Sequence, residues 1–212
     1  LAPYEYYLFN DVSIALEGAL KGEEGILVIA GTGSIALSKK ENAYRRVGGW
    51  GYMLGDEGSA YWLTKEMFKH YTRQVDGREP RTQLVKLIKD KFDLEKEYDL
   101  ISYLSNTLEN DRRKVAEQAV LLEELLKMED PVAFKLVEEL SKHLSLLINT
   151  LGEDFHREIK VSYLGGVFNL GEALFEALEK ELSHHIKLTK PVFSPEKGAV
   201  LLAQREKLKG GD

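Results

Sequence analysis

The chain has 212 residues and a formal charge of −6, and this acidic balance argues against nucleic-acid partners, whose binding proteins usually carry a clustered basic face. It contains no cysteine, which excludes disulfides, thiolate nucleophiles, cysteine-bound iron–sulfur clusters and thiolate zinc sites. Because no apolar run approaches the roughly 20 residues of a membrane helix and no signal-peptide pattern is found, we expect a cytoplasmic protein without a membrane partner.

The first part of the chain is predicted to alternate strands and helices. The expected elements are, in order, a strand over 4–9, a helix over 11–21, a buried strand over 25–30, a hairpin with strands over 35–38 and 43–47, and a helix over 57–73. Asp11 is placed to cap the first helix, and Gly22 is placed to close it.

The middle of the chain, residues 81–151, is predicted to be helical, because leucines and valines recur there at helical spacing. The last part should contain a strand over 158–164, a helix over 171–184, a strand over 186–189 and a helix over 196–209. This order predicts an α/β fold. The charged fraction of 30%, rich in Lys and Glu, also resembles the composition of thermophile proteins.

The segment Gly31-Thr32-Gly33-Ser34 follows directly on the predicted buried strand over 25–30. Its glycines free the backbone to approach a ligand, and its hydroxyl and N–H groups offer donors to phosphate oxygens. A lone segment of this kind is more often an ordinary hairpin turn. The segments near it favour a binding site.

Residues 48–59 contain five glycines interleaved with aromatic and acidic side chains, a pattern that a packed core does not need. A sugar site does need it, because an apolar ring face suits Trp50 and ring hydroxyls suit a carboxylate such as Asp56. The same residues begin a predicted helix, so capping is the alternative. We assign Glu57 and Ser59 to capping and Asp56 to the site.

Two further segments follow predicted strands, where α/β sheets place their ligands. Asn10-Asp11 offers a carboxylate that could act as a general base, although the local pattern alone favours a helix cap. The segment Gly165-Gly166-Val167-Phe168-Asn169 fits either an adenine or ribose contact or a tight turn. The five histidines show no spacing that indicates a metal site, so none is assigned.

Taken together, these segments resemble the N-acetylglucosamine kinase branch of the BadF/BadG/BcrA/BcrD ATPase-like family, within the actin/hexokinase/Hsp70 superfamily. The matching segments are Asn10-Asp11, Gly31-Thr32-Gly33-Ser34, Gly48-Gly49-Trp50-Gly51, Gly55-Asp56-Glu57-Gly58-Ser59 and Leu164-Gly165-Gly166-Val167. The resemblance implies an α/β, ribonuclease-H-like actin/hexokinase ATPase fold. Residues 1–20 would end the N-terminal lobe, and 21–212 would form the C-terminal lobe, with a helical insertion at about 78–152.

The resemblance also implies roles for single residues. Asp11 is similar in position to the catalytic base, and Thr32 with Gly31 and Gly33 to the second phosphate loop. Gly165 and Gly166 are similar to part of the adenosine pocket. The implied sugar contacts are Asn10, Ser34, Gly49, Trp50, Gly51 and Asp56. ATP with Mg²⁺ would then donate its γ-phosphoryl group to a sugar hydroxyl, the 6-hydroxyl being the expected acceptor.

The chain departs from the family pattern at two places. The family opens with a strand and an Asp-Gly-Gly-Gly-Thr-type first phosphate loop, which this chain lacks, so we expect most of the N-terminal lobe to be absent and the chain alone to bind weakly without turnover. Animal N-acetylglucosamine kinases carry Asn where this chain has Ile35, which leaves glucosamine, glucose or another hexose open as the substrate.

Three alternatives follow from the same resemblance. The dehydratase activators of the family are excluded, because they hold an iron–sulfur cluster with cysteines that this chain lacks. A BadF-type ATPase and a non-catalytic sugar- or nucleotide-sensing module stay open, and the presence of Asp11 favours an enzyme over the second. Dimers are common for this fold, so a homodimer is also open.

Overall fold

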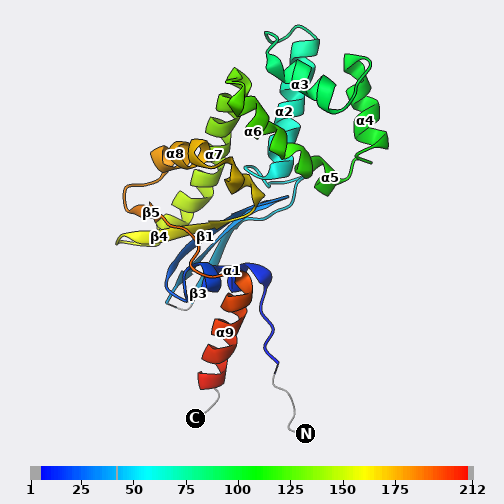
Figure 1. The fold of residues 1–212 in the computed structure, drawn as a ribbon. Helices are drawn as coiled ribbons and strands as arrows, with labels where there is room; N and C mark the ends of the chain where they lie inside the picture. The colour runs from blue at the N-terminus through cyan, green and yellow to red at the C-terminus, as the bar shows by residue number, and fades with distance from the viewer. Residues whose placement is uncertain (1–5, 42, 210–212) are drawn as a thin grey trace.

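A mixed five-stranded sheet lies at the centre of the computed structural model, which describes residues 6–41 and 43–209 (Figure 1). Its strands are β1 (Gly25–Ala30), β2 (Ser34–Lys40), β3 (Ala43–Gly48), β4 (Ile159–Leu164) and β5 (Ile186–Leu188). Their order across the sheet is β3-β2-β1-β4-β5. β1, β2 and β3 pair antiparallel, whereas β4 runs parallel to both β1 and β5.

The central strand β1 is buried on both faces, as its continuous apolar sequence predicts. Successive side chains of a strand point to opposite faces. Ile26 and Val28 therefore belong to a large core on one face, while Leu27 belongs to a smaller core on the other. The large core contains side chains of α2, α7 and α8, and the smaller one contains those of α1.

The helices fall into two groups around this sheet (Figure 1). Those next to the sheet are α1 (Asp11–Ala19), α7 (Pro131–Gly152), α8 (Glu172–Glu181) and α9 (Pro195–Lys209). A helical part beyond the sheet contains α2 (Ala60–Val75), α3 (Gln83–Lys91), α4 (Leu100–Asn106), α5 (Arg112–Glu117) and α6 (Leu121–Lys127). Short 3₁₀ helices η1 (Glu97–Asp99), η2 (Gln118–Val120) and η3 (Gly166–Leu170) complete the set.

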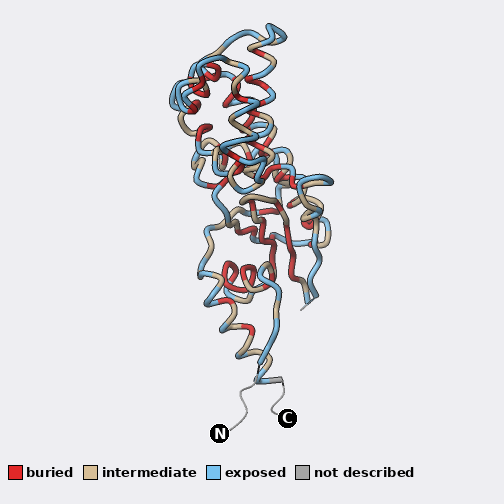
Figure 2. Tube along the Cα trace, turned by 90° about the vertical axis from the view of Figure 1, so that its right-hand side faces the viewer, coloured by how far each residue is buried: buried red, intermediate tan, exposed pale blue. Residues whose placement is uncertain are grey.

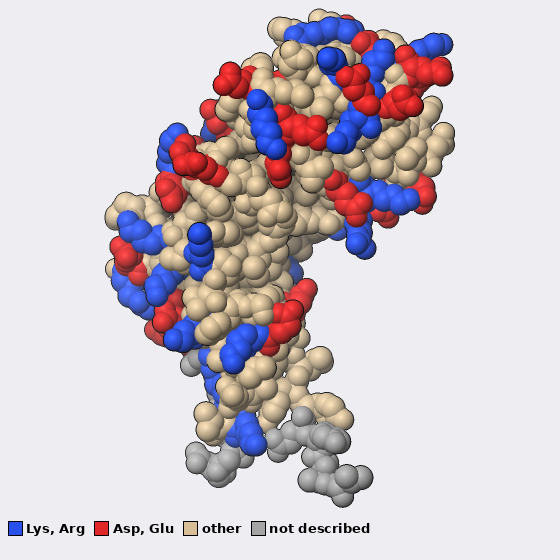
Figure 3. All heavy atoms as spheres, viewed as in Figure 1, with Lys and Arg blue, Asp and Glu red and all other residues tan. Residues whose placement is uncertain are grey.

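Buried residues occur both in the sheet and in the helical part (Figure 2). A single core cluster contains Ile26 of β1, Met67 of α2, Ile88 of α3 and Leu136 of α7. On the face shown in Figure 3, acidic and basic side chains are interspersed over the helices, without a wide basic area. None of the helices in the described ranges is long and apolar enough to cross a bilayer.

α1 and α9 cross at very close range on the small-core face of the sheet. A Cβ atom on Gly198 would overlap the backbone oxygen of Ile14, and one on Gly18 would overlap that of Ser194. Glycine is therefore required at both helix positions. Beside this crossing, the fully buried Glu17 carboxylate pairs with Lys39 of β2 at 2.6 Å and Arg205 of α9 at 2.8 Å.

Most predicted elements are confirmed to within a few residues, with three corrections. The expected strand over 4–9 is wrong where the structure describes it, since residues 6–9 pair with no described strand; residues 4 and 5 lie outside the described residues. Asn10 rather than Asp11 caps α1, because its side chain accepts the N–H of Ser13. The helix expected from Glu57 begins at Ala60, capped by Ser59.

Candidate functional site

The Gly31-Thr32-Gly33-Ser34 segment is a tight turn that joins β1 to β2 and lies against the start of α2. The N–H of Gly31 donates to the oxygen of Gly33 at 2.9 Å, and the N–H of Ala60 donates to the oxygen of Gly31 at 2.8 Å. Within the described residues, the N–H groups of Thr32 and Gly33 and the Thr32 hydroxyl have no hydrogen-bond partner. A Cβ on Gly31 would meet open space. The turn can therefore offer donors to an anionic ligand.

The Gly165-Gly166 turn lies directly beside this first turn. The two turns meet because β1 and β4 are parallel neighbours, so their carboxyl ends lie at the same edge of the sheet. Gly165 has a φ of +111°, and a Cβ there would overlap the oxygen of Ala30. Only glycine allows the two backbones to approach so closely.

A cavity of about 310 Å³ connects the two turns. Gly31 and Thr32 line it on one side and Gly166 on another. Its remaining walls are Ala60 and Leu63 of α2, Ala116, Glu117, Ala119, Val120 and Glu123 of the following helices, and Val167, Asn169 and Leu170 of η3. Val167 and Asn169 belong to the segment that the sequence analysis selected after the glycine pair. The other residues were missed, and no local pattern marks residues 116–123 as part of a site.

The glycine-rich segment 48–59 folds back onto the first turn. The N–H of Gly49 donates to the oxygen of Ser34 at 3.0 Å, and the Ser34 hydroxyl donates to the oxygen of Glu57 at 2.6 Å. Gly48, Gly49 and Gly51 all have a positive φ, so this path depends on glycine. Trp50 lies in the segment with 67% of its surface exposed, and the Arg46 guanidinium lies 5.2 Å from its ring centroid.

Within this segment, Asp56 is buried and has a left-handed backbone conformation, with a φ of +62°. Its Oδ1 accepts the N–H of Ser34 at 3.4 Å, and its Oδ2 accepts the Arg112 Nη2 at 2.5 Å. The structure therefore brings together Ser34, Gly49 and Asp56, as expected for one site. The sequence analysis missed Arg112, which lies 56 positions from its partner in the chain.

Asn10 and Asp11 lie at the start of α1, near the same edge of the sheet. Val12 in the first turn of α1 packs on the small core together with Ile29 and Leu164, near the carboxyl ends of β1 and β4. The Asp11 side chain is exposed and accepts the N–H of Val12 at 2.9 Å. Within the described residues, neither side chain hydrogen-bonds to the two glycine turns and neither lines the cavity, so the structure places them at the edge but not in the cavity.

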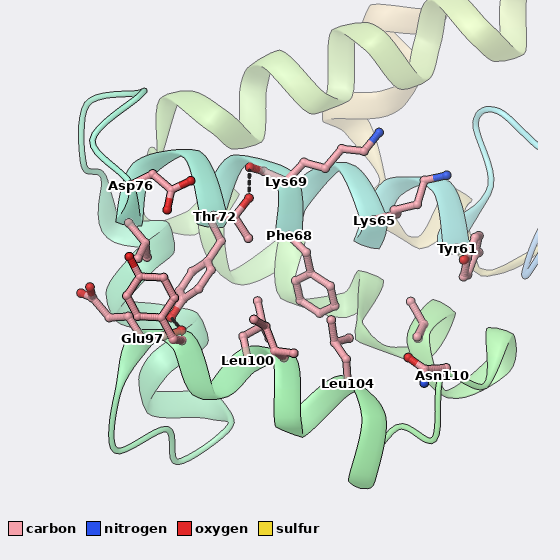
Figure 4. Close-up of a pocket in the computed structure, with 15 residues that line it drawn as sticks. Tyr61, Lys65, Phe68, Lys69, Thr72, Asp76, Glu97, Leu100, Leu104 and Asn110 are labelled. Carbon is pink, nitrogen blue, oxygen red and sulfur yellow. Dashed lines mark hydrogen bonds between the residues drawn. The ribbon is translucent and has the colours of Figure 1, made fainter.

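A second, more apolar cavity of about 450 Å³ lies between α2 and α4 (Figure 4). Phe68 points toward Leu100 and Leu104 across it, while the side chains of Lys65 and Lys69 extend away. None of the residues that the sequence analysis selected lines this cavity. Its walls lack the backbone donors and glycines of the first site, which favours the cavity at the sheet edge for polar ligands.

The histidines and carboxylates of the described ranges form no group of three that could hold a metal ion. The buried ring of His70 contacts Glu79, with its Nδ1 2.6 Å from Oε2. The backbone and hydroxyl donors of the first turn suit phosphate oxygens, whereas a metal bound to those phosphates would have to be held mainly by ligands outside this turn.

Residues 3–203 match the BadF/BadG/BcrA/BcrD ATPase family. The chain is 30% identical to the N-acetyl-D-glucosamine kinase of Dictyostelium discoideum over 95% of its own length and 66% of the relative's. It is also 30% identical to the N-acetylmuramic acid/N-acetylglucosamine kinase of Clostridium acetobutylicum, over 93% of this chain and 66% of the relative. It thus spans just under two thirds of the length of these curated relatives.

The fold is also similar to that of a solved structure, a putative N-acetylglucosamine kinase from Chromobacterium violaceum. The TM-score is 0.73 at 26% sequence identity, over 91% of this chain and 64% of that one. The two comparisons agree that the similarity extends over nearly all of this chain and about two thirds of its relatives.

Proposed function

The chain belongs to the BadF/BadG/BcrA/BcrD ATPase family, and we propose that it is the sugar- and nucleotide-binding part of an ATP-dependent hexosamine or hexose kinase. The relatives that cover most of this chain are named as sugar kinases, which supports a sugar as the phosphoryl acceptor. The sheet order β3-β2-β1-β4-β5 supports a ribonuclease-H-like lobe over 21–212. Residues 1–20 are proposed as the end of the other lobe, although α1 packs on the sheet of this one.

The observation that carries the proposal is the meeting of two glycine turns around one cavity. Gly31, Thr32 and Gly33 are proposed to form the phosphate-binding turn. Phosphate oxygens would be held by the N–H groups of Thr32 and Gly33 and by the Thr32 hydroxyl, which have no partner in the described residues, while the Gly31 N–H donates to the oxygen of Gly33. Gly165 and Gly166 are proposed to border the adenosine. The 310 Å³ cavity that joins Thr32 to Gly166 is consistent with one nucleotide extending between the turns.

The sugar is proposed to lie on the other side of the first turn, over the glycine-rich segment. An exposed Trp50 offers its ring to the apolar face of a sugar, and the Asp56 carboxylate keeps lone pairs free beyond its two present partners. Asn10, Ser34, Gly49 and Gly51 complete the proposed contacts. Ile35 lies against Gly49, since a Cβ added to Gly49 would be 2.7 Å from the Ile35 Cδ1. An apolar side chain therefore occupies the position at which animal N-acetylglucosamine kinases are expected to carry Asn.

Asp11 is proposed as the general base that takes the proton of the attacking sugar hydroxyl. Its carboxylate is exposed at the carboxyl edge of the sheet, where a hydroxyl can approach it. ATP with Mg²⁺ would supply the phosphoryl group, and positioning with charge neutralisation would supply most of the rate. This chain's residues would bind, orient and deprotonate the acceptor.

The proposal is tested by a coupled ADP-release assay on the complete gene product that contains this chain. Glucosamine, N-acetylglucosamine, glucose and N-acetylmannosamine are offered in turn, with ATP and Mg²⁺. We expect ADP release that depends on at least one sugar. Sugar-independent ADP release would instead show an ATPase, and sugar binding without any ADP release would show a sensing module.

Asp11→Asn tests the base in the same assay. The substitution keeps the size of the side chain but removes its basicity, so kcat should fall by about 10²–10⁴-fold while sugar binding is kept. Glu109→Gln, an exposed carboxylate of the helical part, serves as the control and should keep wild-type turnover. Unchanged turnover in Asp11→Asn would show that another group is the base.

A further inference from the structure

Arg112 contacts the proposed sugar site from the helical part of the molecule. It is the first residue of α5, and its Nη2 donates to the Asp56 Oδ2 at 2.5 Å. Asp111 caps this helix by accepting the N–H groups of Arg113 and Lys114, both at 2.9 Å. The start of α5, and with it the backbone of Arg112, is therefore held in place.

The ion pair between Arg112 and Asp56 lies directly against the backbone of Gly33. A Cβ on Gly33 would be 2.5 Å from the Arg112 Nη2 and 2.8 Å from the Asp56 Oδ2. The guanidinium also lies over the ring of Tyr52, with its Cζ 5.5 Å from the ring centroid. Three segments of the proposed site thus meet at this pair: the first turn, the glycine-rich segment and α5.

Arg112 is the main partner that stabilises the negative charge of the buried Asp56 carboxylate. Its side chain is only 4% exposed, and a buried carboxylate is costly unless it is paired and hydrogen-bonded. Its second donor, the N–H of Ser34, is 3.4 Å away, which is a long hydrogen bond. Among the described residues, Arg112 is its one ion-pair partner.

Arg112 also keeps donors that the ion pair does not use. A guanidinium has five N–H donors in a fixed plane, and the buried Nε of Arg112 has no hydrogen-bond partner in the described residues. This fixed plane can orient the carboxylate in one direction, whereas the flexible ammonium of a lysine cannot.

We propose that Arg112 is a positioning residue of the sugar site, which acts by orienting the Asp56 carboxylate toward the sugar hydroxyls. This inference rests on the proposed sugar kinase function. It assigns to the helical part a role in sugar affinity that acts through Asp56. Arg112 itself does not line the cavity between the two glycine turns, so its loss should act on sugar affinity and leave ATP affinity nearly unchanged.

The test is the steady-state kinetics of Arg112→Met in the complete gene product. The variant keeps the length of the side chain but removes the charge and the planar donors. We expect the KM for the sugar to rise by about 10-fold or more and the KM for ATP to change by less than about 2-fold, because uniform binding of one substrate is lost. Arg112→Lys should show an intermediate KM for the sugar.

Arg113→Met is the matched control, because it removes the same kind of side chain one position along α5. The Arg113 side chain is 84% exposed, and its one ion pair among the described residues is with Glu117 at 3.3 Å. Its variant should keep the wild-type KM for both substrates. If Arg112→Met fails to fold, Arg112→Lys keeps a positive charge beside the buried Asp56 carboxylate. Its KM values for sugar and ATP are then compared with those of wild type and Arg113→Met.

A double-mutant cycle with Asp56→Asn separates positioning from a contact of Arg112 with substrate. If Arg112 acts through Asp56, Arg112→Met should add little to the loss that Asp56→Asn already causes. Additive losses, or an equal rise in the KM for ATP, would overturn the inference. So would a wild-type KM for the sugar in both Arg112 variants.

Calorimetric titration of the wild-type protein and the Arg112 variants with each sugar distinguishes a failure of the positioning role from a failure of the proposed kinase function. A wild type that binds sugar, with Arg112 variants that bind it equally well, overturns the inference alone. A wild type that neither binds nor phosphorylates any of the sugars overturns the proposed function and the inference with it.

Discussion

At the scale of single residues, the first turn has two glycines with different surroundings. Gly33 faces the ion pair of Asp56 and Arg112, whereas a Cβ on Gly31 would meet open space within the cavity that Thr32 and Gly166 also line. Neither glycine has a positive φ, so alanine strains neither backbone. Adding one methyl group at each position in turn can therefore distinguish effects on sugar binding from effects on nucleotide binding.

We expect Gly33→Ala and Gly31→Ala to affect different substrates. In Gly33→Ala the methyl group displaces the ion pair but the N–H proposed to hold phosphate is kept, so the KM for the sugar should rise more than the KM for ATP. In Gly31→Ala the methyl group enters the cavity, so the KM for ATP should rise. Each rise should be about 10-fold or more, because small misplacements in a site are costly. Steady-state kinetics on both substrates measure the split, and the same pattern in both variants would contradict it.

At the scale of secondary-structure elements, a buried ionic cluster joins α1, β2, β3 and α9. Glu17 of α1 forms ion pairs with Lys39 of β2 at 2.6 Å and Arg205 of α9 at 2.8 Å. It also accepts a hydrogen bond from the Tyr44 hydroxyl of β3 at 2.5 Å. Burial raises the pKa of Glu17, but the hydrogen bonds from Arg205, Lys39 and Tyr44 outweigh it and hold the pKa below its usual 4.5. Burial and the neighbouring Glu17 raise the pKa of Tyr44.

Glu17→Gln should destabilise the protein by about 3–5 kcal/mol at pH 7, because it leaves the buried Lys39 without its counter-ion. A depressed carboxylate pKa stabilises the fold above the unfolded pKa, and this stabilisation is lost as the pH falls through the folded pKa. The difference in unfolding free energy between wild type and variant should therefore shrink below about pH 4.5. Urea unfolding across pH 3–7 measures it.

The control for this experiment is Glu139→Gln, which removes a half-exposed carboxylate of α7 that lies 4.0 Å from Lys135. Surface pairs of this kind contribute little, so the unfolding free energy should change by less than about 1 kcal/mol. A Glu17→Gln variant as stable as this control would show that the buried cluster does not hold α9 to the sheet.

At the scale of the whole molecule, the helical part and the sheet share one core. Met67 of α2, Leu122 of α6 and Leu140 of α7 belong to the same buried cluster as Ile26 of β1. α7 in particular packs on both the sheet and α8, so it is part of the α/β layer even though it falls within the expected insertion at 78–152. The two parts should therefore unfold together.

We expect one cooperative unfolding transition for the chain, because a continuous core couples its parts. Trp62 reports on the contact between α2 and α7, where its ring lies 4.8 Å from that of His143, and far-ultraviolet circular dichroism reports on all helices. In urea, the fluorescence and dichroism transitions should coincide. Fluorescence and dichroism transitions that do not coincide would show that parts of the chain unfold separately.

The sequence by itself determined the order of strands and helices, because local apolar periodicity and glycine turns depend only on neighbouring residues. The buried run of β1, the hairpin of β2 and β3 and the glycine turn after β4 were all predicted in this way. The family was identified from the same short segments, and the comparisons confirm it. The roles proposed for Asp11 and the other site residues stay predictions.

Only the tertiary structure decided which distant residues meet. The parallel pairing of β1 and β4 places the two glycine turns at one edge, and the path of the helical part carries Arg112 to Asp56 and Ala116 to the cavity. The choice of Asn10 over Asp11 as the cap of α1 also depended on backbone geometry. Contacts across 56 or more positions leave no local pattern in the sequence, because they arise from packing.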